Sequence, residues 1–108
     1  MNDADVVKAL AALAQESRLK VFRLLVVAGL EGVTPGRLTE ETGIGATSLS
    51  FHLKELSHAG LVTQERAGRN LIYRARIDAI NNLIGFLTAN CCAGQACLPQ
   101  PTLDCTNC

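Results

Sequence analysis

Five cysteines are the residues of this 108-residue chain with the most distinctive chemistry, and all of them lie after residue 90. They are Cys91, Cys92, Cys97, Cys105 and Cys108. Thiolates are soft ligands that select soft metal ions, whereas Ca²⁺ and Mg²⁺ prefer oxygen ligands. In a reducing cytosol they are a poor basis for a structural disulfide framework. We therefore predict a C-terminal tail, residues 91–108, that binds a soft ion or responds to oxidation.

The spacing of the cysteines leaves several kinds of site open. Cys91, Cys92 and Cys97 can enclose one ion if the backbone leaves helical geometry there. The pair Cys105-x-x-Cys108 can instead join two of the other cysteines in a four-thiolate zinc site. Reversible disulfide formation is a further alternative. An inert tail is the least favoured interpretation, because five cysteines are crowded into 18 positions.

Small polar side chains mark a second candidate site in the middle of the chain. A tight turn with Gly43 and Gly45 joins a short helix predicted at 35–42 to a helix predicted at 46–58. Such a pair is typical of a helix-turn-helix motif, whose second helix places its N-terminal half in the major groove of DNA. The residues predicted to contact DNA are Thr47, Ser48, Ser50, His52 and Lys54.

A β-hairpin is predicted directly after this helix, with strands at 61–66 and 70–76. Arg66 and Arg69 flank its tip, where arginine reaches phosphate or the minor groove. The whole chain carries 10 Lys and Arg against 10 Asp and Glu, a net charge of zero. Residues 18–76 nevertheless hold nine basic and five acidic residues, a local net charge of +4. The balanced total therefore conceals a basic middle segment suited to DNA.

Further helices are predicted at 3–14, 17–28 and 79–90. The expected N-caps of the helices at 17–28, 35–42 and 79–90 are Ser17, Thr34 and Asp78. The apolar faces expected from helical spacing are Val6, Val7, Leu10, Ala11 and Leu13; Leu19, Phe22, Leu25 and Val26; Leu49, Leu53 and Leu56; and Ile80, Leu83, Ile84 and Leu87. The predicted fold class is α+β, mainly helical: a winged helix-turn-helix domain (α-α-α-α-β-β-α) over 1–90, followed by the Cys-rich tail.

Three stretches carry a resemblance to a known family: ALAQESRLKVFRLL, LTEETGIGATSLSFHLKELSHAGLV and a hairpin ending in YRA. Over roughly residues 6–90 the chain resembles the ArsR/SmtB family of metal-responsive transcriptional repressors. The resemblance implies a homodimer built on the first and last helices. This dimer is expected to bind an imperfect palindrome in a double-stranded operator and to leave it when an inducer binds. It places the DNA-contacting positions on Thr47, Ser48, Ser50 and His52 and on the wing residues Arg66 and Arg69.

The sequence departs from two inducer sites of that family. Residues 33–38, where some members carry a Cys-Val-Cys type arsenic site, contain no Cys, and the last predicted helix lacks the His of the zinc sites. Adjacent cysteines with a third five residues later resemble the C-terminal site of some arsenic-responsive members. We therefore expect As(III), or Sb(III), as the inducer on Cys91, Cys92 and Cys97. Zinc and redox sensing remain the alternatives, and Cys105 and Cys108 are the less favoured ligands.

Several other classes of protein are disfavoured. The sequence shows no Ser/His/Asp set, phosphate-binding glycine loop or paired carboxylates, so we do not expect an enzyme. A thiol-based metal-binding protein without a DNA role is the main alternative. No apolar run approaches the ~20 residues of a membrane span. The N-terminus lacks a basic-then-apolar signal pattern, so we expect a cytoplasmic protein without a membrane partner.

Overall fold

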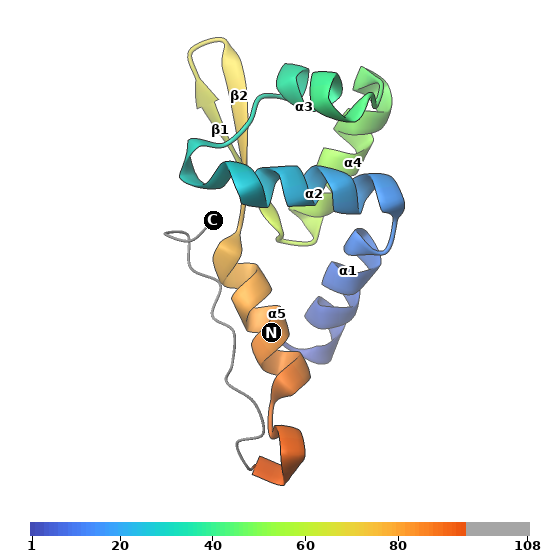
Figure 1. Ribbon diagram of the computed structural model, residues 1–108, viewed down its shortest axis with the longest axis vertical. Helices are drawn as coiled ribbons and strands as arrows, with labels where there is room; N and C mark the ends of the chain where they lie inside the picture. The colour runs from blue at the N-terminus through green and yellow to red at the C-terminus, as the bar shows by residue number, and fades with distance from the viewer. Residues whose placement is uncertain (95–108) are drawn as a thin grey trace.

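Five helices and one β-hairpin follow one another in the computed structural model, which describes residues 1–94 (Figure 1). The elements are α1 (Asp3–Leu13), α2 (Glu16–Ala28), the 3₁₀ turn η1 (Gly29–Glu31), α3 (Pro35–Thr42), α4 (Ala46–His58), β1 (Val62–Ala67), β2 (Asn70–Ala75), α5 (Ile77–Thr88) and the 3₁₀ turn η2 (Cys91–Gly94). This order confirms the predicted winged helix-turn-helix. Within the described residues, no helix is long and apolar enough to cross a membrane.

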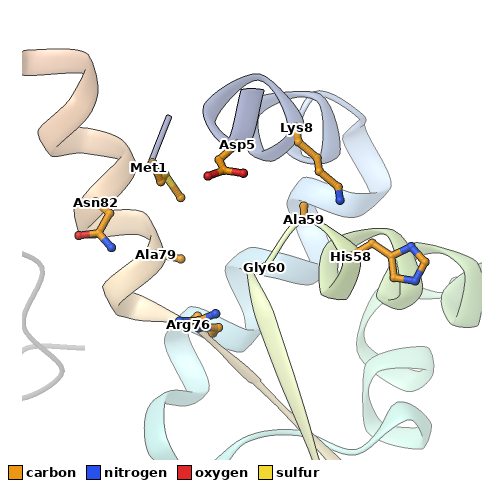
Figure 2. Close-up of a pocket in the computed structure, with 9 residues that line it drawn as sticks. All are labelled: Met1, Asp5, Lys8, His58, Ala59, Gly60, Arg76, Ala79 and Asn82. Atoms are coloured by element: carbon orange, nitrogen blue, oxygen red, sulfur yellow. The ribbon is translucent and has the colours of Figure 1, made fainter. Parts of the chain in front are cut away.

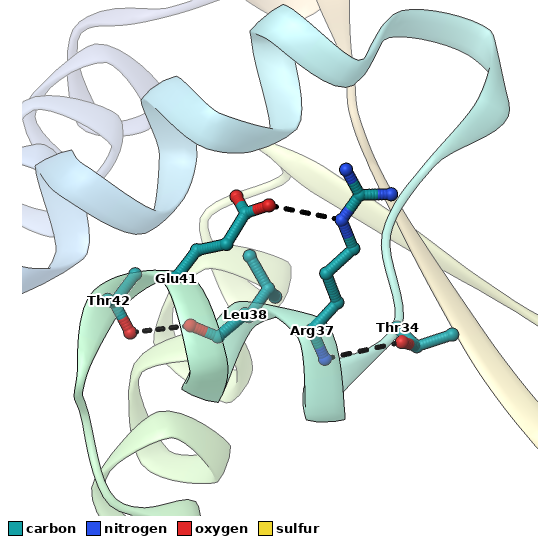
Figure 3. Close-up of polar contacts among 5 residues, drawn as sticks. All are labelled: Thr34, Arg37, Leu38, Glu41 and Thr42. Carbon is teal, nitrogen blue, oxygen red and sulfur yellow. Dashed lines mark hydrogen bonds and ion pairs between the residues drawn. The ribbon is translucent and has the colours of Figure 1, made fainter.

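The helix-turn-helix is fixed by local contacts at both ends of α3, as Figure 3 shows. The Thr34 hydroxyl accepts a hydrogen bond from the Arg37 amide at 3.4 Å, and Pro35 takes the first helical position. Gly43 then ends the helix with φ +73°, a conformation that glycine adopts without strain. The Thr42 hydroxyl donates to the Leu38 carbonyl at 2.6 Å. These contacts confirm the predicted cap at Thr34 and set the entry into α4.

Two of the predicted N-caps are wrong. Helix α2 is capped by Gln15, whose side-chain oxygen accepts from the Arg18 amide at 2.7 Å, so Ser17 lies inside the helix. Helix α5 begins directly after β2 with Arg76 as its cap residue. Asp78 therefore lies in the first turn of α5, where its negative charge interacts favourably with the helix dipole.

The hairpin is tied to the helical body at its base. β1 and β2 pair antiparallel from Val62 opposite Ala75 to Ala67 opposite Asn70. Val33 lies beside β2, where it exchanges two backbone hydrogen bonds of 2.9 Å with Tyr73. Gly32 makes this close approach possible, because a Cβ there would lie 2.5 Å from Ile72 and 2.8 Å from the Tyr73 carbonyl oxygen.

One hydrophobic core gathers side chains from every helix and from the base of the hairpin. The predicted core leucines of α4, Leu49, Leu53 and Leu56, are all buried. The core residues are Val6, Ala9, Ala12, Val21, Phe22, Leu25, Val33, Leu38, Leu49, Leu53, Leu56, Leu61, Val62, Ala79 and Leu83.

The apolar faces predicted for the other helices are only partly buried. Val6 of α1 is buried with two alanines, whereas Val7 and Leu10 of the same predicted face are exposed. Leu19 of α2 and Leu87 of α5 are exposed as well. The expected burial of these four side chains is therefore wrong for the single chain. In α1 the small residues Ala9 and Ala12 occupy the core face, and the larger Val7 and Leu10 lie outside it.

Candidate nucleic-acid interface

Helix α4 presents one buried and one exposed face. Thr47, Ser48, Ser50 and Lys54 are exposed, as a helix that enters a DNA groove requires. Gly45 supplies no side-chain cap. The first amides of the helix therefore make no side-chain hydrogen bond at the cap and stand where phosphate is favourably bound.

His52 differs from the other predicted DNA-contacting residues of α4. It is half-buried, and its Nδ1 atom is buried without a hydrogen-bond partner among the described residues. Its ring lies against that of Phe51, with the centroids 6.0 Å apart and the planes at 62°. The structure thus places His52 at the edge of the exposed face of α4 rather than at its centre.

Phe51 is the residue of α4 that sequence reasoning missed. Its side chain is 55% exposed, although phenylalanine is one of the residues most often buried. It lies four residues after Thr47 and three before Lys54, a spacing that places all three on one helix face. Helical spacing alone could have found it, because Phe51 falls outside the Leu49, Leu53 and Leu56 stripe.

The hairpin carries its two predicted arginines in exposed positions. Arg66 lies on β1 opposite Leu71, and Arg69 lies in the turn beyond the last strand pair. Neither forms an ion pair with another described residue. Both are therefore available to phosphate.

Arg74 braces the hairpin instead of pointing to a ligand. Its Nε donates to the Leu30 carbonyl at 2.7 Å, and its Nη1 lies 3.0 Å from the carboxylate of Glu65. Arg18 and Arg37 are similarly engaged, by the Ala12 carbonyl and the Glu41 carboxylate. The basic middle segment therefore comprises structural arginines, the cations of the α4 and hairpin surface, and Lys20 and Arg23, which are exposed on α2.

A hollow of about 320 Å³ connects the end of α4 with α1 and the start of α5. Figure 2 shows Lys8 and His58 on one side of it and Arg76 and Asn82 on the other. Arg76 also forms a 2.9 Å ion pair with Asp78. The hydrogen bond from Arg76 holds the pKa of the Asp78 carboxyl below its usual range.

The backbone leaves α-helical geometry just before the first two cysteines. α5 ends at Thr88, Asn90 has φ +58°, and Cys91–Gly94 form the 3₁₀ turn η2. Cys91 is half-buried. The described residues contain no group of three or more His, Cys, Asp or Glu that could hold a metal ion. Cys97, Cys105 and Cys108 lie outside the described residues, so the predicted thiolate site stays a prediction.

Comparison with known proteins bears on the helix-turn-helix and the hairpin. A family model for a helix-turn-helix domain matches residues 13–65. The chain is 31% identical over 78 residues to the HTH-type transcriptional regulator YgaV of Escherichia coli strain K12. That alignment covers 72% of this chain and 77% of the relative.

Solved structures show the same architecture. An ArsR-like transcriptional regulator from Rhodococcus sp. RHA1 superposes with a TM-score of 0.71 at 26% identity, over 78% of this chain and 76% of that one. The homodimeric winged helix-turn-helix DNA-binding domain Mb0332 of Mycobacterium bovis superposes with a TM-score of 0.65 at 22% identity. The superposition covers 92% of this chain and 97% of that one. At this identity the likeness concerns the fold alone.

Proposed function

Because the chain belongs to the helix-turn-helix transcriptional regulators of the ArsR type, we propose that it is a homodimeric repressor released from its operator by trivalent arsenic or antimony. One observation carries the DNA-binding part of the proposal: α4 presents a polar, exposed face next to a hairpin with two unengaged arginines. In this proposal α4 enters the major groove, and Arg66 and Arg69 contact phosphate or the minor groove.

Exposed apolar side chains on α1 and α5 support the homodimer. Val7 is 64% exposed and Leu87 57%, and Met1, Leu10 and Phe86 are exposed nearby in the sequence. Figure 1 shows α1 and α5 together at the end of the molecule opposite the hairpin tip. A self-complementary apolar contact there joins two copies about a twofold axis and leaves both copies of α4 for two half-sites of a palindrome.

The thiolates are proposed as the inducer site because of their chemistry and their place after α5. The backbone over Cys91–Gly94 forms a 3₁₀ turn outside α5. In this proposal the thiolates of Cys91 and Cys92 converge there on one ion. With Cys97 they provide three soft ligands for As(III) or Sb(III). Zinc binding or disulfide formation by the same cysteines is the alternative, with Cys105 and Cys108 as further ligands.

Inducer and DNA are coupled through α5 in this proposal. If the inducer binds the DNA-free state more tightly, it weakens DNA binding by the same factor. α5 begins at the hollow that the end of α4 also lines. A change in the setting of α5 in the dimer would alter the spacing of the two α4 helices, which half-sites one helical turn apart tolerate poorly.

Fluorescence anisotropy of the reduced full-length protein on duplex DNA from upstream of its own gene tests the proposal. We expect tight, salt-sensitive and sequence-specific binding that arsenite reverses, while zinc chloride and peroxide in separate titrations do not. Release by zinc alone or peroxide alone would favour the corresponding alternative sensor. Failure to bind any DNA specifically would leave a thiol-based metal-binding protein.

Single Cys→Ser variants test the ligand set in the same assay. Cys91→Ser, Cys92→Ser and Cys97→Ser are each expected to raise the arsenite concentration needed for release at least tenfold. Cys105→Ser and Cys108→Ser are the matched controls and should respond like the wild type. Wild-type responses from the first three variants would contradict the proposed trio.

A further inference from the structure

Phe51 is an exposed aromatic side chain in the middle of a surface that is otherwise polar. The core of the molecule is formed without it, and its helix already buries three leucines. It lies on α4, whereas the exposed apolar residues that support the dimer lie on α1 and α5. Neither folding nor the proposed dimer contact therefore accounts for an apolar ring at this position.

The residues beside Phe51 on the exposed face of α4 indicate which part of a DNA groove its ring would contact. Thr47 precedes it by one helical turn, and Lys54 follows it by nearly one turn on the same face. A lysine at that position suits a phosphate, and a threonine hydroxyl suits a base edge. The aromatic ring therefore lies between a base-reading and a phosphate-binding position, where it would face the floor of the groove.

The major groove offers one apolar group on its base edges, the C5-methyl of thymine. Aromatic and aliphatic side chains contact this methyl group, which distinguishes thymine from cytosine and from the other base-pair orientation. The edge-to-face contact with His52 restrains the Phe51 ring on one side. A restrained ring loses less conformational freedom when it binds.

We propose that Phe51 reads the C5-methyl of a thymine in each operator half-site. The inference rests on the proposed function, since it assumes that α4 enters the major groove. It assigns to Phe51 a role in sequence specificity, whereas Lys54, Arg66 and Arg69 contribute affinity that is insensitive to sequence.

Replacement of thymine by deoxyuridine removes only this methyl group and therefore tests the proposal directly. The full-length protein first selects a duplex from a randomised library. Each thymine of that duplex is then replaced in turn, and Kd is measured by fluorescence anisotropy at one salt concentration. One replacement per half-site is expected to weaken wild-type binding about fourfold, which corresponds to about 0.8 kcal/mol for one buried methyl group.

Phe51→Ala is expected to bind the thymine duplex more weakly and to lose the thymine-to-deoxyuridine difference. The ratio of the two Kd values is measured within one variant, so a change in the folded fraction cancels. Leu30→Ala removes an exposed apolar side chain outside α4 and should keep the fourfold ratio.

Two results would overturn the inference while sparing the proposed function: specific binding without a deoxyuridine-sensitive thymine, or an unchanged ratio in Phe51→Ala. If selection enriches no duplex at all, sequence-specific binding itself is absent. In that case the proposed function fails, and the role of Phe51 fails with it.

Discussion

Helix α4 and the pair α1 and α5 have similar apolar spacing in the sequence but different surroundings in the structure. In α4 the predicted leucines are at most 2% exposed. In α1 and α5 the predicted faces divide, so that Val6 and Leu83 enter the core while Val7 and Leu87 remain exposed. The same periodicity thus accompanies complete burial in one region and an uncovered apolar surface in the other.

The difference separates two ways to bury an apolar stripe. Removal of apolar area from water is favourable whether the covering atoms come from the same chain or from a second copy. Spacing in the sequence reports that a face is apolar but does not identify what covers it. The exposed faces of α1 and α5 therefore point to a contact with a second copy only when the structure shows that the core does not include them.

The largest effect is expected in the buried region. Leu56→Ala removes a side chain that is 0% exposed and should lower the free energy of unfolding by about 3 kcal/mol, through lost burial and the cavity left behind. Urea denaturation followed by circular dichroism measures it. Leu30→Ala, at 79% exposure, is the control and should stay within about 0.5 kcal/mol of the wild type. Equal losses would remove the contrast between buried and exposed leucines.

A charge on the exposed face of α5 should act on association rather than folding. Leu87→Asp is expected to weaken the dimer at least ~30-fold, about 2 kcal/mol, because a carboxylate would be desolvated in an apolar contact. Sedimentation velocity over a concentration series measures this, and circular dichroism should show unchanged helix content. Val27→Asp is the matched control, since Val27 is exposed on α2. Dissociation by Val27→Asp alone would place the dimer contact on α2.

Local signals predicted most of the fold. Thr34, Pro35 and Gly43 bound α3 as expected because caps and turns depend on neighbours within a few residues. Ser17 and Asp78 failed as caps because Gln15 supplied an acceptor earlier and β2 ran directly into α5. Where two neighbouring side chains could each cap a helix, the path of the backbone before the helix decides which one does, and the sequence alone does not show that path.

The candidate site was predicted less completely than the fold. The candidate residues of α4 were predicted from their polarity, and all of them except the half-buried His52 are exposed in the structure. Phe51 is apolar, so the same criterion passed over it. The brace from Arg74 to the Leu30 carbonyl joins residues 44 apart, so no local pattern could distinguish it from the arginines at the tip. The apolar faces of α1 and α5 needed the core to be known first.

A smaller effect is expected where the fold depends on a single local contact. Thr34→Ala removes the hydroxyl that accepts from the Arg37 amide and should lower the free energy of unfolding by about 1 kcal/mol. Thr34→Ser keeps an acceptor in place and should retain most of that stability. Urea denaturation of both variants measures the difference. Equal losses would show that the hydroxyl does not cap α3.

The smallest effect is expected at the junction of hairpin and α5. The pKa of the Asp78 carboxyl is lowered in the folded chain, chiefly because Arg76 donates a hydrogen bond to it. A carboxyl group whose pKa is lower in the folded state stabilises that state above its unfolded pKa, and this contribution is lost as the pH falls through the folded pKa. The stability difference between wild type and Asp78→Asn should therefore be constant near neutral pH and shrink below about pH 4.

Arg76→Gln removes the partner of the same ion pair and should lose the same acid dependence. The double variant should then resemble either single variant, because both substitutions remove one interaction. Urea denaturation at a series of pH values between 3 and 7 measures all four proteins. A difference between wild type and Asp78→Asn that stays constant to pH 3 would contradict the lowered pKa. Since Asp78 lies in the first turn of α5, nine residues before Leu87, loss of the pair should leave the dimer intact, in contrast to Leu87→Asp.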